Sequence, residues 1–248
     1  MTRTAWFHCF AGTAGDMSMA ALVDAGADPM MIADIVGRLG LDGYTLAFED
    51  VMRCGIAATQ AHVAVLDDDR HHDDDHHRHH HRAYRAIREL IDAADLPERV
   101  RHRAQSTFRM LAEVEATMHR MPADDVEFHE VGSVDAIVDI VGTCAALESL
   151  GVERIVCSSI TVGEGTVLAD HGQLPNPAPA VTELLARRNA PSRGIDDRKE
   201  LATPTGVALM CALADEFGPM PAINVVSVGY GAGAVDIPGR PNVVQVVI

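Results

Sequence analysis

The first third of the chain alternates between short runs typical of strands and longer runs typical of helices. Residues 60–66 (QAHVAVL) alternate polar and apolar side chains, which predicts a half-buried strand. Asp28 followed by Pro29 is typical of a helix start, with the aspartate as N-cap and the proline at the first helical position. The same reasoning predicts strands over 4–10, 44–52 and 56–66, a glycine-containing turn over 11–16, and helices over 17–25 and from 28 onward.

The rest of the chain continues this alternation. Ser133 and Gly151 bracket an apolar run of helical length, as its N-cap and its terminator. We expect helices over 82–94, 97–120, 133–150, 180–188 and 204–216 (the last capped by Thr203), strands over 154–168, 223–230 and 242–247, a rigid proline-rich loop over 171–179 and a polar connection over 189–200. Because strands and helices interleave without a repeat of fixed period, we expect an α/β (or α+β) fold. Helices would pack on a mixed sheet, with residues 1–248 as one compact unit.

Charge and composition narrow the class of protein. The 248 residues carry 20 Lys+Arg against 36 Asp+Glu, a formal charge of −16 that disfavours nucleic-acid binding. Asp135 and Asp139 interrupt the most hydrophobic segment, so no run of about 18 apolar residues is available to cross a membrane. The cysteines number five and form no CxxC pair, which disfavours a disulfide scaffold or a zinc knuckle. Since no secretion signal is visible at the start, we expect a cytoplasmic protein.

The most conspicuous segment is the histidine-rich tract over 67–82 (DDDRHHDDDHHRHHHR). It holds seven histidines, six aspartates, three arginines and no apolar side chain, so we expect a mobile loop. Imidazole is a good ligand for nickel, zinc and copper, and several imidazoles on a flexible loop can chelate such ions without preformed geometry. The alternative is a solvated loop whose metal affinity is incidental. The candidate metal ligands of the tract are His71, His72, His76, His77, His79, His80 and His81.

A second motif, residues 128–142 (FHEVGSVDAIVDIVG), places two carboxylates on one face of a helix. Asp135 and Asp139 are four residues apart among valines and isoleucines, so we expect them to be at least partly buried. A buried carboxylate needs a cation, which a divalent metal with His129 as a further ligand would supply. The alternative is that Asp135 faces the helix dipole and Asp139 pairs with an arginine. The candidate catalytic residues are His129, Glu130, Asp135 and Asp139.

Other candidate residues lie at helix starts and on one helix face. The turn 12–16 (GTAGD) and the start at 203–206 could hold an anion through free backbone amides, although neither is a P-loop. The candidate substrate- or phosphate-binding residues are Gly12, Gly15, Asp16, Thr203, Thr205, Gly206 and Arg240. Further candidate metal ligands are Glu115 and His119, four apart on one face, and His171 before the proline-rich loop. The alternatives are a surface contact for the pair and a turn cap for His171.

These motifs, in their order along the chain, resemble those of the LarC family of nickel insertion proteins. The segments that carry the resemblance are CFAGTAGDM at 9–17, RCGI at 53–56, the histidine-rich tract, FHEVGSVDAIVDI at 128–140, HGQLPNPAPA at 171–180, ELATPTG at 200–206, GYGAG at 229–233 and RPN at 240–242. Two positions depart from the pattern. His8 stands where the family tends to have aspartate, and Ala83 stands where a further histidine is usual.

The resemblance implies a nickel chelatase of the lyase class, which inserts Ni²⁺ into the thiolated substrate pyridinium-3,5-bisthiocarboxylic acid mononucleotide. The product is the nickel-pincer nucleotide cofactor of lactate racemase. The resemblance also implies coupling to CTP hydrolysis, with Mg²⁺ or Mn²⁺ at a C-terminal CTP-binding domain that this chain lacks. We therefore expect a separate C-terminal partner chain, and a homo-oligomer is compatible with the sequence. The histidine-rich tract would gather nickel, the helix starts would dock the substrate phosphate, and the second motif would relay nickel or accept a proton. The alternative is a nickel store or metallochaperone that forms no pincer product.

Overall fold

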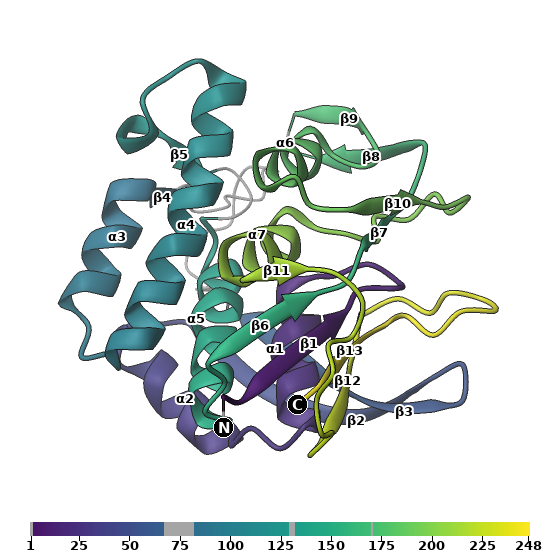
Figure 1. The fold of residues 1–248 in the computed structure, drawn as a ribbon. Helices are drawn as coiled ribbons and strands as arrows, with labels where there is room; N and C mark the ends of the chain where they lie inside the picture. Colours follow the sequence, from purple (N-terminus) through teal and green to yellow (C-terminus); the bar gives the residue numbers. More distant parts are fainter. Residues whose placement is uncertain (1, 67–81, 129–131, 170) are drawn as a thin grey trace.

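The computed structural model describes residues 2–66, 82–128, 132–169 and 171–248, and within them a mixed sheet of seven strands forms the centre (Figure 1). The strand order is β11 (Glu216–Phe217), β6 (Arg154–Cys157), β1 (Thr4–His8), β13 (Val243–Val247), β12 (Val228–Ala232), β3 (Ile56–Val65) and β2 (Tyr44–Arg53). The strands β11, β6 and β1 are parallel, β13 is antiparallel to both of its neighbours, β12 is parallel to β3, and β2 is antiparallel to β3. The expected mixed sheet is confirmed.

Helices cover one face of this sheet. They are α1 (Gly15–Asp24), α2 (Pro29–Gly37), α3 (Tyr84–Ala93), α4 (Glu98–His119), α5 (Val134–Ser149), α6 (Pro179–Arg188) and α7 (Pro204–Leu213). Helix α1 packs on β3, β12 and β13, α5 packs on α1, α2 and α4, and α3 lies against α4 on the outside of this layer (Figure 1). The main hydrophobic core lies between the helices and the sheet. No helix of the described residues is long and apolar enough to cross a membrane.

The other face of the sheet carries a smaller apolar cluster. Trp6, Val156 and Val247 are buried there together, and Ile223 packs against them from the segment before β12. The indole Nε1 of Trp6 donates a hydrogen bond to the carbonyl oxygen of Gly218, 3.2 Å away. This irregular segment therefore shields the second face where no helix does.

Several predicted boundaries are wrong, because the structure contains short strands that the local pattern does not mark. Residues 172–175 form β9 (Gly172–Pro175) against β8 (Thr166–Ala169) instead of a loop, and β10 (Ser192–Gly194) pairs with β7 (Ile160–Val162) inside the expected polar connection. β4 (Arg82–Ala83) pairs with β5 (Glu127–Phe128), so helix α3 starts at 84 instead of 82. A short 3-10 helix, η1 (Ala123–Asp125), precedes β5. Helix α7 ends at 213 instead of 216, because residues 216–217 form β11 and join the sheet. Residues 223–227 are not a strand, and helix α1 begins at Gly15, two residues earlier than expected.

The starts of α1 and α7 are joined by backbone hydrogen bonds. The amide of Thr13 donates to the carbonyl of Leu201 (2.9 Å), and the amide of Thr203 donates to the carbonyl of Thr13 (3.0 Å). Gly206 lets the two starts approach, since a Cβ there would lie 2.5 Å from both the Thr13 carbonyl oxygen and the Ala14 Cα. The position of each helix start therefore depends on the other.

Gly206→Ala is expected to lower the free energy of unfolding by about 1–3 kcal/mol, because the added methyl meets backbone atoms that cannot rotate away. The matched control is Gly37→Ala at the end of α2, where a Cβ meets no atom within 4 Å. Urea unfolding of both variants measures the difference. If Gly206→Ala is as stable as Gly37→Ala, the two helix starts are not closely packed.

Candidate functional site

A cavity of about 470 Å³ opens where the starts of α1, α5 and α7 come together beside β3. We call it the acidic cavity. It is lined by Ala14, Gly15, Asp16, Gln60, Ala61, His62, Val63, Ala64, Ser133, Asp135, Ala136, Asp139, Glu200, Thr203, Pro204, Thr205 and Ala234. Three of the segments that carry the family resemblance, 9–17, 128–140 and 200–206, therefore contribute to one cavity.

At these helix starts, side chains accept hydrogen bonds from some of the backbone amides. The Thr203 hydroxyl accepts a hydrogen bond from the amide of Gly206 (3.2 Å), so the predicted cap of α7 is confirmed. The carboxylate of Asp16 accepts a hydrogen bond from the amide of Met17 (2.7 Å) within α1. Ser133 occupies the N-cap position of α5 as expected, but its side chain makes no capping hydrogen bond.

The lining of the cavity is rich in acidic side chains. Its described lining contains four carboxyl side chains and one imidazole, His62, and neither lysine nor arginine. The two predicted carboxylates of α5 do share one face, since both Asp135 and Asp139 line the cavity. Their burial differs: Asp139 is partly buried as expected, whereas Asp135, one turn earlier, is exposed. The expectation of burial is therefore wrong for Asp135, because the start of α5 faces the open side.

Asp139 is an acid of this site with an incomplete set of hydrogen bonds. Its Oδ1 atom is buried and has no hydrogen-bond partner among the described residues, so the alternative of an arginine partner is not found. Burial raises the pKa of the Asp139 carboxyl well above its ordinary value, and the negative charges of Asp16 and Asp135 raise it further. A hydrogen bond from the backbone N–H of Asp16 opposes this shift. Burial also raises the pKa of Asp16 itself.

Asp139→Asn is expected to make the ligand-free protein more stable than its parent at neutral pH, by a margin that shrinks as the pH falls. The raised pKa means that the folded state favours the protonated acid, so Asp139 stabilises the fold at pH values below its unfolded pKa. This contribution is lost as the pH rises through the folded pKa, and the asparagine variant escapes that loss. The difference in unfolding free energy should grow by up to about 1.4 kcal/mol per pH unit in this interval.

Urea unfolding of parent and variant at several pH values between 4 and 8 measures this difference. The matched control is Asp42→Asn, at an exposed position outside the cavity. A difference between Asp139→Asn and its parent that stays constant with pH would show that the Asp139 carboxyl is as easily ionised in the folded as in the unfolded chain.

A second cavity of about 190 Å³ adjoins the first. It is lined by Glu115, Met118, Val167, Leu168, Ala169, His171, Leu174, Ala178, Pro179, Ala180, Glu200 and Pro204. Because Glu200 and Pro204 line both cavities, the two are neighbours. The carboxylate of Glu115 lies 3.3 Å from Nε2 of His119, and the centroid of the His119 ring lies 5.2 Å from that of His171.

The predicted metal ligands Glu115, His119 and His171 are thus brought together, although they come from α4 and from the residue before β9. Within the residues that the structure describes, no group of three or more His, Cys, Asp or Glu side chains is arranged to hold a metal ion. Their role as nickel ligands therefore stays a prediction. His129, Glu130 and the histidines of the tract lie outside the described residues.

Some predicted substrate-binding residues lie outside the acidic cavity. Gly12, with φ of +104°, packs against the carbonyl of Leu201, and Gly206 packs against the first helix start. Nη1 of Arg240 lies 3.7 Å from a carboxylate oxygen of Asp197, away from the lining residues. Gly15, Asp16, Thr203 and Thr205 do line the cavity.

Sequence reasoning missed Gln60, His62 and Glu200, all of which line the acidic cavity. Glu200 had a signal, since it opens the motif ELATPTG and adjoins the predicted helix start. His62 stands in an alternating strand, where nothing in the sequence marks which face is covered. Gln60 is marked only by its hydrogen bond to Arg53, which the sequence does not show.

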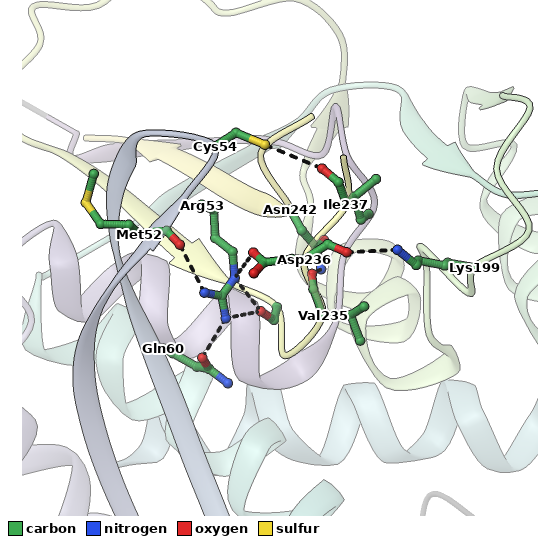
Figure 2. A network of polar contacts seen from close by, with 10 residues as sticks. Met52, Arg53, Cys54, Gln60, Lys199, Val235, Asp236, Ile237 and Asn242 are labelled. Carbon is green, nitrogen blue, oxygen red and sulfur yellow. Dashed lines mark hydrogen bonds and ion pairs between the residues drawn. The ribbon is translucent and has the colours of Figure 1, made fainter. Parts of the chain in front are cut away.

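A buried arginine holds one rim of the cavity. The Arg53 guanidinium, 11% exposed, donates to the carbonyl oxygen of Gly233 from Nε (3.1 Å) and Nη2 (2.9 Å), and to Oε1 of Gln60 (2.8 Å) (Figure 2). Asp236 lies beside it, 3.6 Å from Nε, and accepts a hydrogen bond at its backbone carbonyl from Nζ of Lys199 (Figure 2). This network ties the end of β2 to β3, to the loop after β12 and to the segment before Glu200.

A sequence profile described as "Nickel insertion protein" matches residues 5–248. The chain belongs to the nickel insertion protein family. It is 43% identical over 245 residues to the pyridinium-3,5-bisthiocarboxylic acid mononucleotide nickel insertion protein of a Nocardioides species, covering 99% of this chain and 59% of that protein. It is 39% identical over 247 residues to the protein of the same name from Staphylococcus epidermidis, covering 100% of this chain and 59% of that protein.

The chain thus spans about three-fifths of the length of the curated relatives that it matches. No solved structure matches it. The family membership agrees with the motifs of the sequence, and the acidic cavity shows where several of those motifs meet.

Proposed function

We propose that this nickel insertion family member takes part in inserting Ni²⁺ into pyridinium-3,5-bisthiocarboxylic acid mononucleotide. The observation that carries the proposal is the match over nearly the whole chain to relatives named for that substrate. A second observation supports it: three motif segments that are far apart in the sequence line one cavity, large enough for a small molecule. The proposed enzyme class is a chelatase, that is, a lyase.

The chemistry of the substrate agrees with carboxyl groups at the site. Two thiocarboxylates at ring positions 3 and 5 flank carbon 4, so a nickel ion held by both sulfurs faces that carbon. A nickel–carbon bond forms there only if the carbon gives up its proton, and a positioned carboxylate is a suitable acceptor. We assign this role to the motif that contains Asp135 and Asp139, with His129 and Glu130 as further candidates outside the described residues.

Nickel is the cargo of this reaction, and we propose that the histidine-rich tract collects it. The neighbouring second cavity is lined by Glu115 and His171, with His119 beside them, and it adjoins the acidic cavity because Glu200 lines both. These residues are a proposed relay for the ion. The relay and the cavity together describe a protein that gathers nickel and then transfers it.

We further propose coupling to CTP hydrolysis, with Mg²⁺ or Mn²⁺ at the CTP. The support is indirect: the curated relatives are longer than this chain, so they contain a further region that could bind a nucleotide. That region would act as a C-terminal partner of residues 1–248, which we take to be one folded unit in the cytoplasm. Self-association of this unit is compatible with the proposal.

The proposal is tested by incubating the protein with Ni²⁺ and the thiolated substrate, with and without CTP and the C-terminal region of a longer relative. Mass spectrometry and absorption spectra detect the nickel–carbon product. We expect product when all components are present. Nickel binding without product under every condition would favour the alternative of a nickel store or metallochaperone, while product without the partner region would show that residues 1–248 suffice.

A further inference from the structure

The acidic cavity has the wrong charge for the phosphate of the substrate. Its described lining presents Asp16 from α1, Asp135 and Asp139 from α5, and Glu200 from the segment before α7, against the single imidazole His62 of β3. Like charges repel, and the amides of the helix starts would have to bind the phosphate against these carboxylates. An anion is therefore disfavoured in the cavity, and a cation is favoured.

An unsatisfied buried atom points to the same conclusion. Asp139 lines the cavity from α5, and its Oδ1 atom is buried and has no hydrogen-bond partner among the described residues. The other carboxylate oxygen lies at the start of α1, where a Cβ on Gly15 would be 2.7 Å from Oδ2. A buried acceptor without a partner costs about 1–3 kcal/mol, so a ligand that brings positive charge to Oδ1 would relieve this cost.

The arrangement of the carboxylates suits a ligand with a delocalised positive charge better than a single metal ion. Among the described residues, no three acidic or metal-ligating side chains are arranged to hold one metal ion. Between the acids, the lining offers small apolar surfaces at Ala61, Val63 and Ala136. A flat ring with a delocalised positive charge fits such a site, because its faces can contact apolar side chains while its edge lies near carboxylates.

We propose that the acidic cavity binds the cationic pyridinium ring of the substrate, with the ring next to Asp139 and the phosphate directed away from the four carboxylates. This inference rests on the proposed function, since it takes the substrate class from there. It reverses the expectation from the sequence that the helix starts at 12–16 and 203–206 dock the phosphate. It also places the ring carbon that must lose a proton beside an unsatisfied carboxyl group.

The test uses two probes of nearly the same size and with the same ribose phosphate, one with a charged and one with a neutral ring. Nicotinamide mononucleotide carries a pyridinium cation and a phosphate, and its dihydro form carries the same phosphate on a neutral ring. We expect the parent protein to bind the cationic probe at least about tenfold more tightly, a difference of about 1.4 kcal/mol. Ribose 5-phosphate should not compete with it at equal concentration. Calorimetric titration at two salt concentrations separates this effect from the general charge of the protein.

Variants locate the preference in the cavity. Asp139→Asn and Asp16→Asn should each reduce the discrimination between the probes to about threefold or less, whereas Asp42→Asn, which lies outside the cavity, should keep it. Two cavity variants are used so that one poorly folded protein does not decide the result. Affinity of the parent for the cationic probe should also rise as the pH is raised, because burial raises the pKa of Asp16 and of Asp139 and both carboxyls therefore gain their charge only above the ordinary range.

Three results would overturn the inference: equal binding of both probes, competition by ribose 5-phosphate as strong as that of the cationic probe, or no binding of either probe at millimolar concentration. A failure of this inference can be distinguished from a failure of the proposed function. If the complete reaction mixture yields the nickel–carbon product while the probes bind equally, the function stands and the ring lies elsewhere. If the probes are discriminated but no product forms, the cavity binds pyridinium rings without inserting nickel.

Discussion

Asp139→Asn is expected to lower the single-turnover rate of nickel insertion by about a hundredfold or more, the usual contribution of a general base. The variant keeps the size of the side chain and removes its ability to accept a proton. The Asp139 carboxyl is suited to this role because it lies in the cavity, has an unpartnered oxygen, and has a pKa raised by burial and by the charges of Asp16 and Asp135. A carboxylate whose pKa is raised well above its ordinary value is a stronger proton acceptor once it is ionised.

The measurement is the rate of nickel–carbon product formation, with nickel and substrate both saturating, as a function of pH. Asp42→Asn serves as the control for a lost surface charge. The loss should lie mainly in the rate of the chemical step, while the concentration of substrate needed for half saturation should rise only about threefold, as expected from the weaker binding of the pyridinium ring. If Asp139→Asn inserts nickel at the parental rate with an unchanged pH profile, Asp139 only supports the start of α1, and the base must be sought at His129 or Glu130.

Arg53→Ala is expected to lower the free energy of unfolding by about 2–4 kcal/mol, because it leaves buried acceptors without donors. Four hydrogen bonds from the guanidinium are lost, two to the carbonyl of Gly233, one to Gln60 and one to the carbonyl of Met52 (Figure 2). The charge pairing with Asp236 contributes little to this loss, since the Asp236 side chain is 81% exposed.

The matched control is Arg154→Ala, which removes a similar guanidinium from a pair with Glu216 at 2.6 Å on the surface. Exposed pairs of this kind contribute about 0–1 kcal/mol. Urea or guanidinium unfolding of both variants gives the comparison. Equal losses in the two variants would show that the Arg53 network does not hold the rim of the acidic cavity.

Much of the fold could be predicted from local pattern. The cap of α2 by Asp28, the cap of α7 by Thr203 and the antiparallel pair β2 and β3 all follow from residues close together in the sequence. The short strands β4, β9 and β10 could not be predicted in this way. Each is two to four residues long. β4 and β10 exist because a partner from elsewhere in the chain supplies their hydrogen bonds, whereas β9 pairs with the preceding strand β8.

The candidate site was predictable in its parts and not in its assembly. The sequence marks Asp16, Asp139 and Thr205 as separate candidates, because each stands at a helix start or on an apolar helix face. It does not show that all three line one cavity, nor that Glu200 connects this cavity to the second one with His171. The sign of the electrostatic field in the cavity depends on that assembly, so the sequence alone does not show that the two helix starts expected to dock the phosphate lie near four carboxyl side chains.

The central claim is that insertion takes place in the acidic cavity and that the histidine-rich tract only collects nickel. Deleting residues 71–81 removes all seven histidines of the tract and no apolar side chain. The decisive measurement is single-turnover product formation by this deletion variant with saturating nickel, compared with Asp139→Asn under the same conditions. The account predicts fewer bound nickel ions but a parental rate for the deletion variant, and full nickel binding but a rate at least about a hundredfold lower for Asp139→Asn. The opposite pattern, with product lost on deletion and retained in Asp139→Asn, would contradict the account.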